Sequence, residues 1–513
     1  MPFALAPVLC APAAKTANGG TEVMTFNSWQ YLAFLPVTVL AYFLLPHKLR
    51  WVLLLAASYF FYMMWNPWLA FLILGTTVVA YGAALAIKKV PKHKKLFLVL
   101  TLVVCLGVLF GFKYLSFALN SVVDLINLFP IHVQAPVIDI ILPVGISFYT
   151  FQTLSYVIDV YRGDFEPEKH FGYFALYVSY FPQLVAGPIE TPKILLPQLK
   201  EEHHFNTEDL VAGLRHLLFG FLLKVAIADI AGIYVNRVFA SLQNAGTGEI
   251  LAAVVLFAIQ IYCDFNGYSE IAIGSARIMG VKLSQNFDDP FMATSMSDLF
   301  RRWHMSLQRW FRYYVYIPLG GNRKGKFRHV LNTIIVFTLC GLWHGANWTY
   351  VLWGLYAGVL IVLEILVVFP LLGQAKKKGI PVDNGVFAWI RRFLIWAMFI
   401  PSSILFRSAN IQQAGLAFTR LFAGFQPDGN AILGFSVTSL CYVLLAALTM
   451  ELSYHYVYRG PRKSDIPSEA SLTQPTLVAK EAVLALSMVA IIAATWAYLL
   501  SHGDVSTFAY FQF

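Results

Sequence analysis

Residues 336–355 read VFTLCGLWHGANWTYVLWGL, an apolar run that is interrupted by a histidine, His344. A run of about 20 mostly apolar residues is long enough to cross a bilayer as a helix. An ionisable side chain at membrane depth is costly to bury, so a histidine there marks a functional site by default. A second histidine, His304, ends the sequence RRWH at residues 301–304. Together the two histidines predict chemistry performed inside a membrane.

The composition is that of a protein that crosses the membrane many times. Of its 513 residues, 58% are hydrophobic and only 12% are charged, whereas soluble domains carry roughly 25% charged residues. The candidate spans are residues 29–45, 51–64, 68–87, 96–119, 138–158, 173–186, 210–230, 251–279, 331–342, 348–370, 386–405, 431–450 and 482–500. Because several are too short or too polar to cross alone, we expect an all-α polytopic protein with about eleven spans, plus re-entrant or buried helices.

The net charge of +10 does not indicate nucleic-acid binding, because the basic residues lie between the apolar segments. They gather in residues 88–95, 301–328, 376–378 and 459–463, with Arg391 and Arg392. This is the pattern of cytoplasmic loops in membrane proteins. Following the chain from one basic loop to the next places the N- and C-termini outside the cytoplasm. The partner that this charge distribution predicts is the lipid bilayer.

The remaining composition indicates one membrane domain without a metal site. Residues 1–23 lack a basic region ahead of their apolar stretch, so we expect a disordered extension rather than a signal peptide. Residues 24–513 then form a single domain. Four of the five cysteines lie far apart within apolar spans and are expected to be buried small side chains, with no disulfide framework and no metal.

A strongly basic, amphipathic segment covers residues 295–329. At helical spacing Arg301, His304, Gln308 and Arg312 share one face. The segment is too polar to cross lipid alone, so it lies at the cytoplasmic interface or beside a polar cavity. Two interpretations of its arginines stay open: they bind an anionic donor through phosphates or carboxylates, or they snorkel from an interfacial helix. A snorkelling helix does not require His304.

His344 is expected to lie deep in the membrane, because the chain re-enters the apolar region near residue 331. A neutral histidine is a suitable general base, and Gly345 and Ala346 leave room for a substrate. The alternative is a core histidine that bonds to a backbone carbonyl. The polar stretch 264–270, DFNGYSE, lies in another apolar run, where its acidic residues need partners. We expect the arginines of residues 301–312 as those partners, and a structural role for Asp264, Asn266 and Gln183.

These segments together resemble the membrane-bound O-acyltransferase family, in particular its bacterial branch that acetylates secreted polysaccharides such as alginate. The matching strings, in order, are LPVGISF at 142–148, FPQLVAGPI at 181–189, DFNGYS at 264–269, RRWHMSL at 301–307, YIPLGGNR at 316–323 and LWHGA at 342–346. The resemblance implies a ring of helices around a central funnel. One position departs from it: Tyr313 stands where relatives usually carry Asp, so any support from that Asp must come from elsewhere, with Asp264 a candidate.

The resemblance also implies roles for residues. His344 matches the family's catalytic histidine and His304 the second histidine of the bacterial branch. Residues expected to bind the donor or substrate are Arg301, Arg302, Trp303, Gln308, Arg312, Trp343 and Asn347. No bound cofactor is implied. The acyl donor is a co-substrate, acetyl-CoA or an acyl carrier protein.

The resulting expectation is an O-acetyltransferase of the bacterial cytoplasmic membrane that acts on an exported glycan. The chain contains no hydrolase-like extracytoplasmic domain, so a separate SGNH-type partner is expected to finish the transfer. One alternative is a D-alanyl exporter for teichoic acid, which would use a carrier-protein donor. A transporter or channel is the alternative from another class; it explains the many spans but not the basic segment that leads to WHG.

Overall fold

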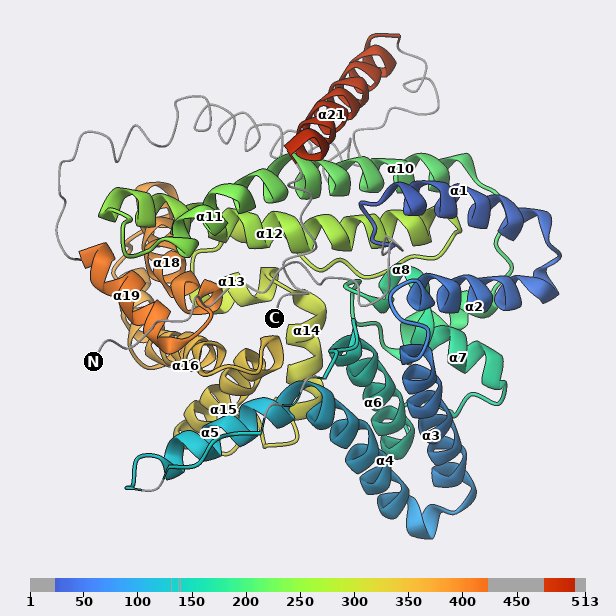
Figure 1. Ribbon diagram of the computed structural model, residues 1–513, viewed down its shortest axis with the longest axis horizontal. Coiled ribbons are helices and arrows are strands. Elements are labelled where there is room, and N and C mark those ends of the chain that lie inside the picture. The colour runs from blue at the N-terminus through green and yellow to red at the C-terminus, as the bar shows by residue number, and fades with distance from the viewer. Residues whose placement is uncertain (1–23, 131, 137, 139, 423–474, 503–513) are drawn as a thin grey trace.

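A computed structural model describes residues 24–130, 132–136, 138, 140–422 and 475–502, and the regular elements in these ranges are helices (Figure 1). The α-helices are α1 (Trp29–Leu44), α2 (His47–Met63), α3 (Leu69–Lys89), α4 (Lys94–Leu109), α5 (Leu115–Ile126), α6 (Ile146–Arg162), α7 (Phe171–Ser179), α8 (Phe181–Leu184), α9 (Pro192–Lys200), α10 (Thr207–Phe221), α11 (Ile230–Ala240), α12 (Thr247–Ile278), α13 (Met296–Arg302), α14 (Met305–Phe311), α15 (Lys326–His344), α16 (Trp348–Leu363), α17 (Phe369–Lys377), α18 (Gly385–Arg407), α19 (Ile411–Phe422) and α21 (Pro475–His502). The shorter segments are the 3-10 turns η1 (Pro91–His93) and η4 (Pro290–Met292) and the π-helical segments η2 (Phe110–Tyr114), η3 (Leu222–Asp229), η5 (Arg312–Tyr316) and η6 (Glu364–Val368).

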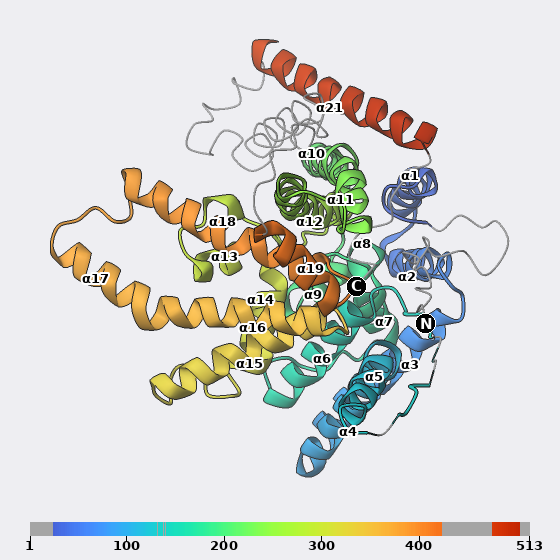
Figure 2. The ribbon, with the colours of Figure 1, turned by 60° about the vertical axis from the view of Figure 1, so that its left-hand side comes forward.

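The short helices α13 and α14 lie in the middle of the molecule. Figure 1 shows α10, α11 and α12 running together above them, α3, α4 and α6 below on one side, and α15 and α16 below on the other. The turned view in Figure 2 keeps α14 at the centre of the same groups. The short helices that flank His304 therefore lie between groups of long helices.

The described residues confirm an all-helical membrane architecture but not the expected number of spans. Six helical stretches in these ranges are long and apolar enough to cross a bilayer: Leu69–Lys89, Pro91–Ile126, Thr207–Ala240, Thr247–Ile278, Trp348–Lys377 and Gly385–Arg407. Shorter apolar helices cover Trp29–Leu44 and Ala485–Leu499. About eleven spans were expected from composition, and that figure is not confirmed.

Two expected spans differ from the structure. The span at 138–158 is wrong, because α6 begins only at Ile146, after Gly145 adopts a left-handed backbone with φ of 73°. The segment 173–186 breaks into α7 and the four-residue α8, as its proline at 182 indicates. The expected span at 431–450, the extension at 1–23 and the basic loop at 459–463 lie outside the described residues.

Two glycine pairs bring α10 and α12 into close contact. A Cβ on Gly220 would lie 2.7 Å from the carbonyl oxygen of Gly267, and one on Gly274 would lie 2.6 Å from that of Gly213. Both distances are shorter than any real Cβ contact. Small residues let membrane helices approach until their backbones touch, which gains dispersion energy along the whole contact. These glycines therefore set the distance between the two helices.

Charged and polar side chains fill the same interface on either side of the glycines. The pairs are Asp209 with Arg277 at 2.6 Å, His216 Nδ1 with Glu270 Oε2 at 2.6 Å, and Lys224 with Asp264 at 2.7 Å. Lys224 also contacts Asp229 at 2.7 Å. Polar groups at membrane depth are tolerated when they pair with one another. Through Asp264, Glu270 and Arg277, α12 is thus linked to α10 and η3, which run beside it.

The hairpin of α15 and α16 is built in a similar way. A Cβ on Gly341 would overlap the carbonyl oxygen of Tyr350, and one on Gly354 would overlap that of Phe337. Gly345 follows the end of α15 in an extended conformation, and a Cβ there would collide with the Tyr350 ring. The tight hairpin buries the start of its turn, residues 343–345.

Each π-helical segment contributes a side chain that bonds to another helix. Lys113 in η2 reaches α15, Lys224 in η3 reaches α12, Tyr314 in η5 donates to Asp159 of α6, and Glu364 in η6 accepts from the N-terminus of α13. A π-helical turn inserts an extra residue into a helix and is frequent at functional sites. In this fold the π-helical turns tie the long helices to the centre.

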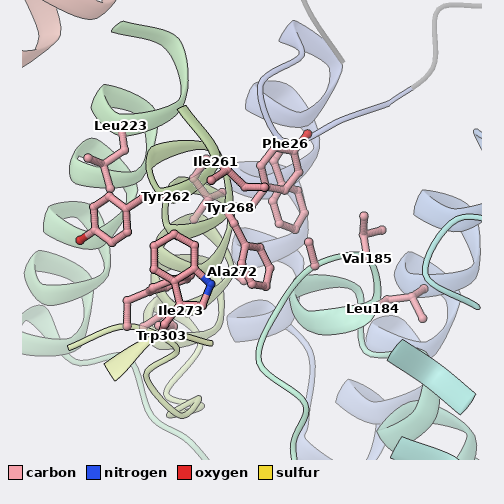
Figure 3. Packing of buried hydrophobic residues seen from close by; sticks show 14 of the residues in the cluster. Phe26, Leu184, Val185, Leu223, Ile261, Tyr262, Tyr268, Ala272, Ile273 and Trp303 are labelled. Atoms are coloured by element: carbon pink, nitrogen blue, oxygen red, sulfur yellow. The ribbon is translucent and has the colours of Figure 1, made fainter. Parts of the chain in front are cut away.

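Aromatic residues on α12 anchor the segment before His304. Figure 3 shows Trp303 beside Tyr262, and their ring centroids are 5.9 Å apart. On the far side of α12, Tyr268 stacks on Phe26 at 5.3 Å. Burial of each such ring stabilises the fold by roughly 1.5–3 kcal/mol. Trp303 thus fixes the end of α13 against α12.

Candidate active site

His344 is the last residue of α15 and is buried in the turn of the hairpin. Its ring contacts Trp353 of α16 and Phe406 of α18, with centroid distances of 5.5 Å and 5.2 Å. Asn347 caps α16 by accepting from the backbone N–H of Thr349 at 3.1 Å. The hairpin therefore presents His344 to the centre of the molecule on a rigid support.

His304 lies at a break between α13 and α14, and its backbone is left-handed with φ of 46°. Only Asp289 shares a positive φ among the non-glycine residues that the structure describes. A residue other than glycine in this region costs of order 1–3 kcal/mol and persists where its surroundings impose it. The expectation that Arg301, His304, Gln308 and Arg312 share a face of one helix is therefore wrong, because the helix ends at Arg302 and restarts at Met305.

The break brings the two histidines together. The ring centroids of His304 and His344 lie 6.4 Å apart, and the Trp343 ring lies beside both, at 5.7 Å from His304 and 5.0 Å from His344. The other rings around the pair are Phe265 at 4.5 Å and Phe148 at 6.3 Å from His304. A small acyl group held between the imidazoles could contact both. In these apolar surroundings, the electrostatic interaction between each imidazole and a polarised bond would be stronger than in water.

Comparisons with known proteins identify the family of this chain. Residues 168–406, which include both histidines, match the MBOAT, membrane-bound O-acyltransferase family. A probable alginate O-acetylase AlgI from Azotobacter vinelandii is 33% identical over 513 residues, which cover 96% of this chain and 100% of that protein. The chain belongs to the membrane-bound O-acyltransferase family. It is a multi-pass membrane acyltransferase, so the transporter or channel interpretation is not supported.

Two further relatives of this O-acyltransferase have names that describe different transferred groups and different acceptors. A peptidoglycan O-acetyltransferase from Helicobacter pylori is 32% identical over 433 residues, 76% of this chain and 78% of that protein. A teichoic acid D-alanyltransferase from Streptococcus thermophilus is 29% identical over 237 residues, 43% of this chain and 56% of that protein. Similarity to the acetyltransferases thus extends over far more of the chain.

The C-terminal end of α15 is held by two residues that sequence analysis missed. Lys113 Nζ donates to the carbonyl oxygens of Trp343 at 2.7 Å and His344 at 3.2 Å. The hydroxyl of Tyr114 donates to the carbonyl oxygen of Leu342 at 3.2 Å. A signal was present: Lys113 is the only charged residue between Lys95 and Asp124 in an apolar helix, and such residues are functional candidates.

A second missed group fixes the first turn of α14. Asn286 Oδ1 accepts from the Ser306 hydroxyl at 2.7 Å, while Asn286 Nδ2 donates to Ser269 Oγ of α12 at 3.0 Å. Ser306 Oγ also accepts from the backbone N–H of Ile189 at 3.0 Å. These bonds connect three of the resembling strings, GPI, DFNGYS and RRWHMSL, around His304. Neither Asn286 nor Ser306 carries a charge that would have marked it in the sequence.

The predicted arginines divide into bound and exposed residues. Arg302 pairs with Asp298 at 3.2 Å and donates to the carbonyl oxygen of Asp288 at 3.1 Å, so it braces α13. Glu364 accepts from the backbone N–H of Ser297 at 2.9 Å and so places a negative charge at the N-terminus of α13. Arg301 and Arg312 are exposed. Only these two remain open to an anionic ligand.

The structural cluster has partners other than those expected. Asp264 pairs with Lys224 rather than with the arginines of residues 301–312, so that expectation is wrong. The reason is geometric, since α10 and η3 lie directly along α12. Asn266 donates to the Tyr262 hydroxyl at 3.2 Å, and Gln183 donates to the carbonyl oxygen of Tyr177 at 2.9 Å. All three predicted residues are buried.

The other predicted ligand-binding residues occupy different places. Trp343 lies at the histidine pair, and no residue in the described ranges accepts a hydrogen bond from its buried indole Nε1. Trp303 is buried against α12, and Gln308 is half-buried on α14. Asn347 Nδ2 donates to the carbonyl oxygen of Ala409 at 2.6 Å, which links the hairpin to the end of α18. Of these residues, Trp343 is therefore the one that lies beside both histidines.

Proposed function

We propose that this O-acyltransferase moves an acetyl group from a cytoplasmic thioester, acetyl-CoA or an acyl carrier protein, to a hydroxyl of an exported polysaccharide. Its place would be the cytoplasmic membrane of a bacterium. The similarity to alginate and peptidoglycan O-acetylating relatives over most of the chain supports this acceptor class. The observation that carries the proposal is the pair of histidines, 6.4 Å apart, at the centre of the helices.

In the proposed reaction His344 acts as the general base. It takes the proton of the acceptor hydroxyl while the hydroxyl oxygen attacks the thioester carbonyl. The tetrahedral intermediate then collapses, the carbon–sulfur bond breaks, and the proton passes to the departing thiolate. The products are an ester and a thiol, so atoms and charge balance without another reactant.

The negative oxygen of the intermediate needs hydrogen-bond donors. Trp343 Nε1 is a buried donor without an acceptor in the described part of the chain, and it lies on the side chain that contacts both histidines. His304 supplies a second ring nitrogen. A preorganised donor of this kind contributes roughly 10²–10³-fold to turnover in other acyl-transfer enzymes. We assign oxyanion stabilisation to Trp343 and His304.

The donor would enter beside the exposed arginines. Arg301 lies in the last turn of α13 and Arg312 begins η5, so they flank the segment that carries His304. Their guanidinium groups suit the phosphates of coenzyme A or of a carrier-protein arm. The acceptor approaches from the opposite side of the membrane, and a separate extracytoplasmic SGNH-type partner completes delivery to the glycan.

D-alanyl transfer to teichoic acid is the second candidate. The teichoic acid relative supports it, although the match covers less than half of this chain. Both candidates use the histidine pair, and they differ in donor, since the second requires a carrier protein. A donor comparison therefore distinguishes them.

The test is transfer of labelled acetyl from acetyl-CoA by the purified protein in lipid, with an oligosaccharide acceptor. Wild type is expected to transfer label, and His344→Ala is expected to lose nearly all of it. His93→Ala, which changes an exposed histidine in η1, is the matched control and should equal wild type. Transfer by His344→Ala at the wild-type rate would remove the catalytic assignment. Activity only with an aminoacylated carrier protein would favour the teichoic acid candidate.

A further inference from the structure

Lys113 is the only charged residue between Lys95 and Asp124, within a largely apolar helical stretch that faces outward over much of its length. It lies in the π-helical segment η2, and its side chain is half-buried. A charge in such a place needs partners, and a membrane protein keeps it for function more often than for stability. Its partners are the carbonyl oxygens of Trp343 and His344, with the Ser147 hydroxyl at 3.5 Å.

The carbonyls that Lys113 binds belong to the last turn of α15. The last four carbonyls of an α-helix have no partner within the helix, and their partial negative charge attracts a cation. Tyr114 Oη binds the carbonyl of Leu342, so neighbouring residues of η2 serve three successive carbonyls. The extra residue of a π-helical turn changes the directions of the side chains. We name Lys113 and Tyr114 the η2 clamp.

We propose that Lys113 is a positioning residue for acyl transfer: its ammonium group holds the last turn of α15 and thereby fixes the His344 ring relative to His304. The role in transfer rests on the proposed function. The clamp itself rests on the hydrogen bonds alone.

The contacts of Lys113 extend to the His304 side of the site. Ser147 directly precedes Phe148, whose ring lies 6.3 Å from the His304 ring and 5.3 Å from the Trp343 ring. Lys113 Nζ itself lies 5.9 Å from the centre of the Trp343 ring. One ammonium group thus contacts the backbone that carries His344 and the start of α6, which packs on His304. Loss of that group frees both sides of the pair.

The first test is steady-state kinetics of Lys113→Met, which keeps the length of the side chain and removes its donors. Since a misplacement of about 1 Å can cost roughly 100-fold in rate, kcat is expected to fall by about 10- to 100-fold. KM for the donor should change by less than about twofold, because the donor arginines are untouched. Lys113→Arg, which can still donate to the carbonyls, should recover part of kcat. Lys95→Met, on the exposed start of α4, is the matched control.

The second test does not depend on activity. Hydrogen–deuterium exchange of peptides that cover residues 338–346 should be faster in Lys113→Met than in wild type, because the unclamped turn frays. Peptides from α10 and α12 serve as the internal control. Should wild type transfer no acetyl, the proposed function fails, while faster exchange still supports the clamp.

Two results overturn the inference. One is a wild-type kcat in Lys113→Met; the other is unchanged exchange over residues 338–346, even where kcat falls. Should Lys113→Met fail to fold, Tyr114→Phe decides, since it removes one hydroxyl from the same clamp. Faster local exchange and a lower kcat in Tyr114→Phe support the clamp, and wild-type values for both reject it.

Discussion

Asn286 and Ser306 are joined by a hydrogen bond of 2.7 Å in which the Ser306 hydroxyl donates to Asn286 Oδ1. Ser306 lies two residues after His304, in the first turn of α14. The backbone N–H of Met305 also donates to the carbonyl oxygen of Asn286, at 2.8 Å. Asn286 thus holds the chain immediately after the left-handed histidine, and through Ser269 it connects that chain to α12.

Asn286→Ala is expected to lower kcat more than it changes KM, because the His304 backbone loses its support. Stability should also fall by roughly 1–3 kcal/mol, since the Ser306 hydroxyl and amide are left buried without their acceptor. Kinetics and thermal unfolding in detergent measure the two effects. Asn322→Ala, at an exposed position after η5, is the control. Equal kinetics in the two variants would show that Asn286 does not support the site.

The glycine contacts between α10 and α12 predict a position-specific cost. Gly267→Ala should destabilise the protein by about 1–3 kcal/mol, because the added Cβ meets the Gly220 carbonyl and the helices must move apart. Gly248→Ala in the first turn of α12 has nothing within 4 Å and should be neutral or slightly stabilising. Thermal unfolding of both variants measures the difference. Equal midpoints would mean that the helices do not approach as closely as described.

The long helices could be predicted from sequence because hydrophobic runs determine them directly. The apolar stretches that became α3, α12 and α16 appear in the sequence with nearly their final limits. The break at His304 could not be predicted in this way. Arg301, His304 and Gln308 keep helical spacing through it, and tertiary contacts from Trp303 and Asn286 impose the left-handed backbone. The local sequence pattern therefore cannot predict a backbone conformation that depends on contacts with residues far away in the chain.

The partners of the buried charges show the same limit. The sequence indicates that Asp264 needs a cation but not which one. The arginines of residues 301–312 were expected to provide it. Lys224 meets it because glycines let α10 and η3 lie along α12. For His304 and His344 the resemblance provided the pairing, and the structure adds the distance. Lys113 was missed although its isolation among apolar residues is visible in the sequence.

The buried group of Lys224, Asp229 and Asp264 predicts that removing Lys224 strongly destabilises the protein. Lys224→Met removes the ammonium group that pairs with both carboxylates, and removing one partner of a buried ion pair typically costs about 3–5 kcal/mol. Lys88→Met, in an exposed pair with Glu166 at 2.6 Å, should cost less than about 1 kcal/mol. Thermal unfolding compares the variants. In the double variant Lys224→Met with Asp264→Asn, part of the stability should return; a double variant no more stable than Lys224→Met would show that charge balance is not the cause.

The left-handed backbone of His304 predicts that glycine is more stable than alanine at this position, the reverse of the usual order in a helix. At an ordinary helical position alanine is more stable than glycine by about 0.5–1 kcal/mol, and Gln308 within α14 provides that reference. At His304, glycine should be the more stable by about 1 kcal/mol, since it adopts positive φ without the strain that a Cβ causes. Thermal unfolding of the four variants, His304→Gly, His304→Ala, Gln308→Gly and Gln308→Ala, measures both differences. Both His304 variants remove the imidazole and should be almost inactive. Backbone strain should therefore change stability between the two variants, whereas activity should be lost in both because the ring is absent. Alanine more stable than glycine at both positions would mean that His304 does not hold a left-handed backbone.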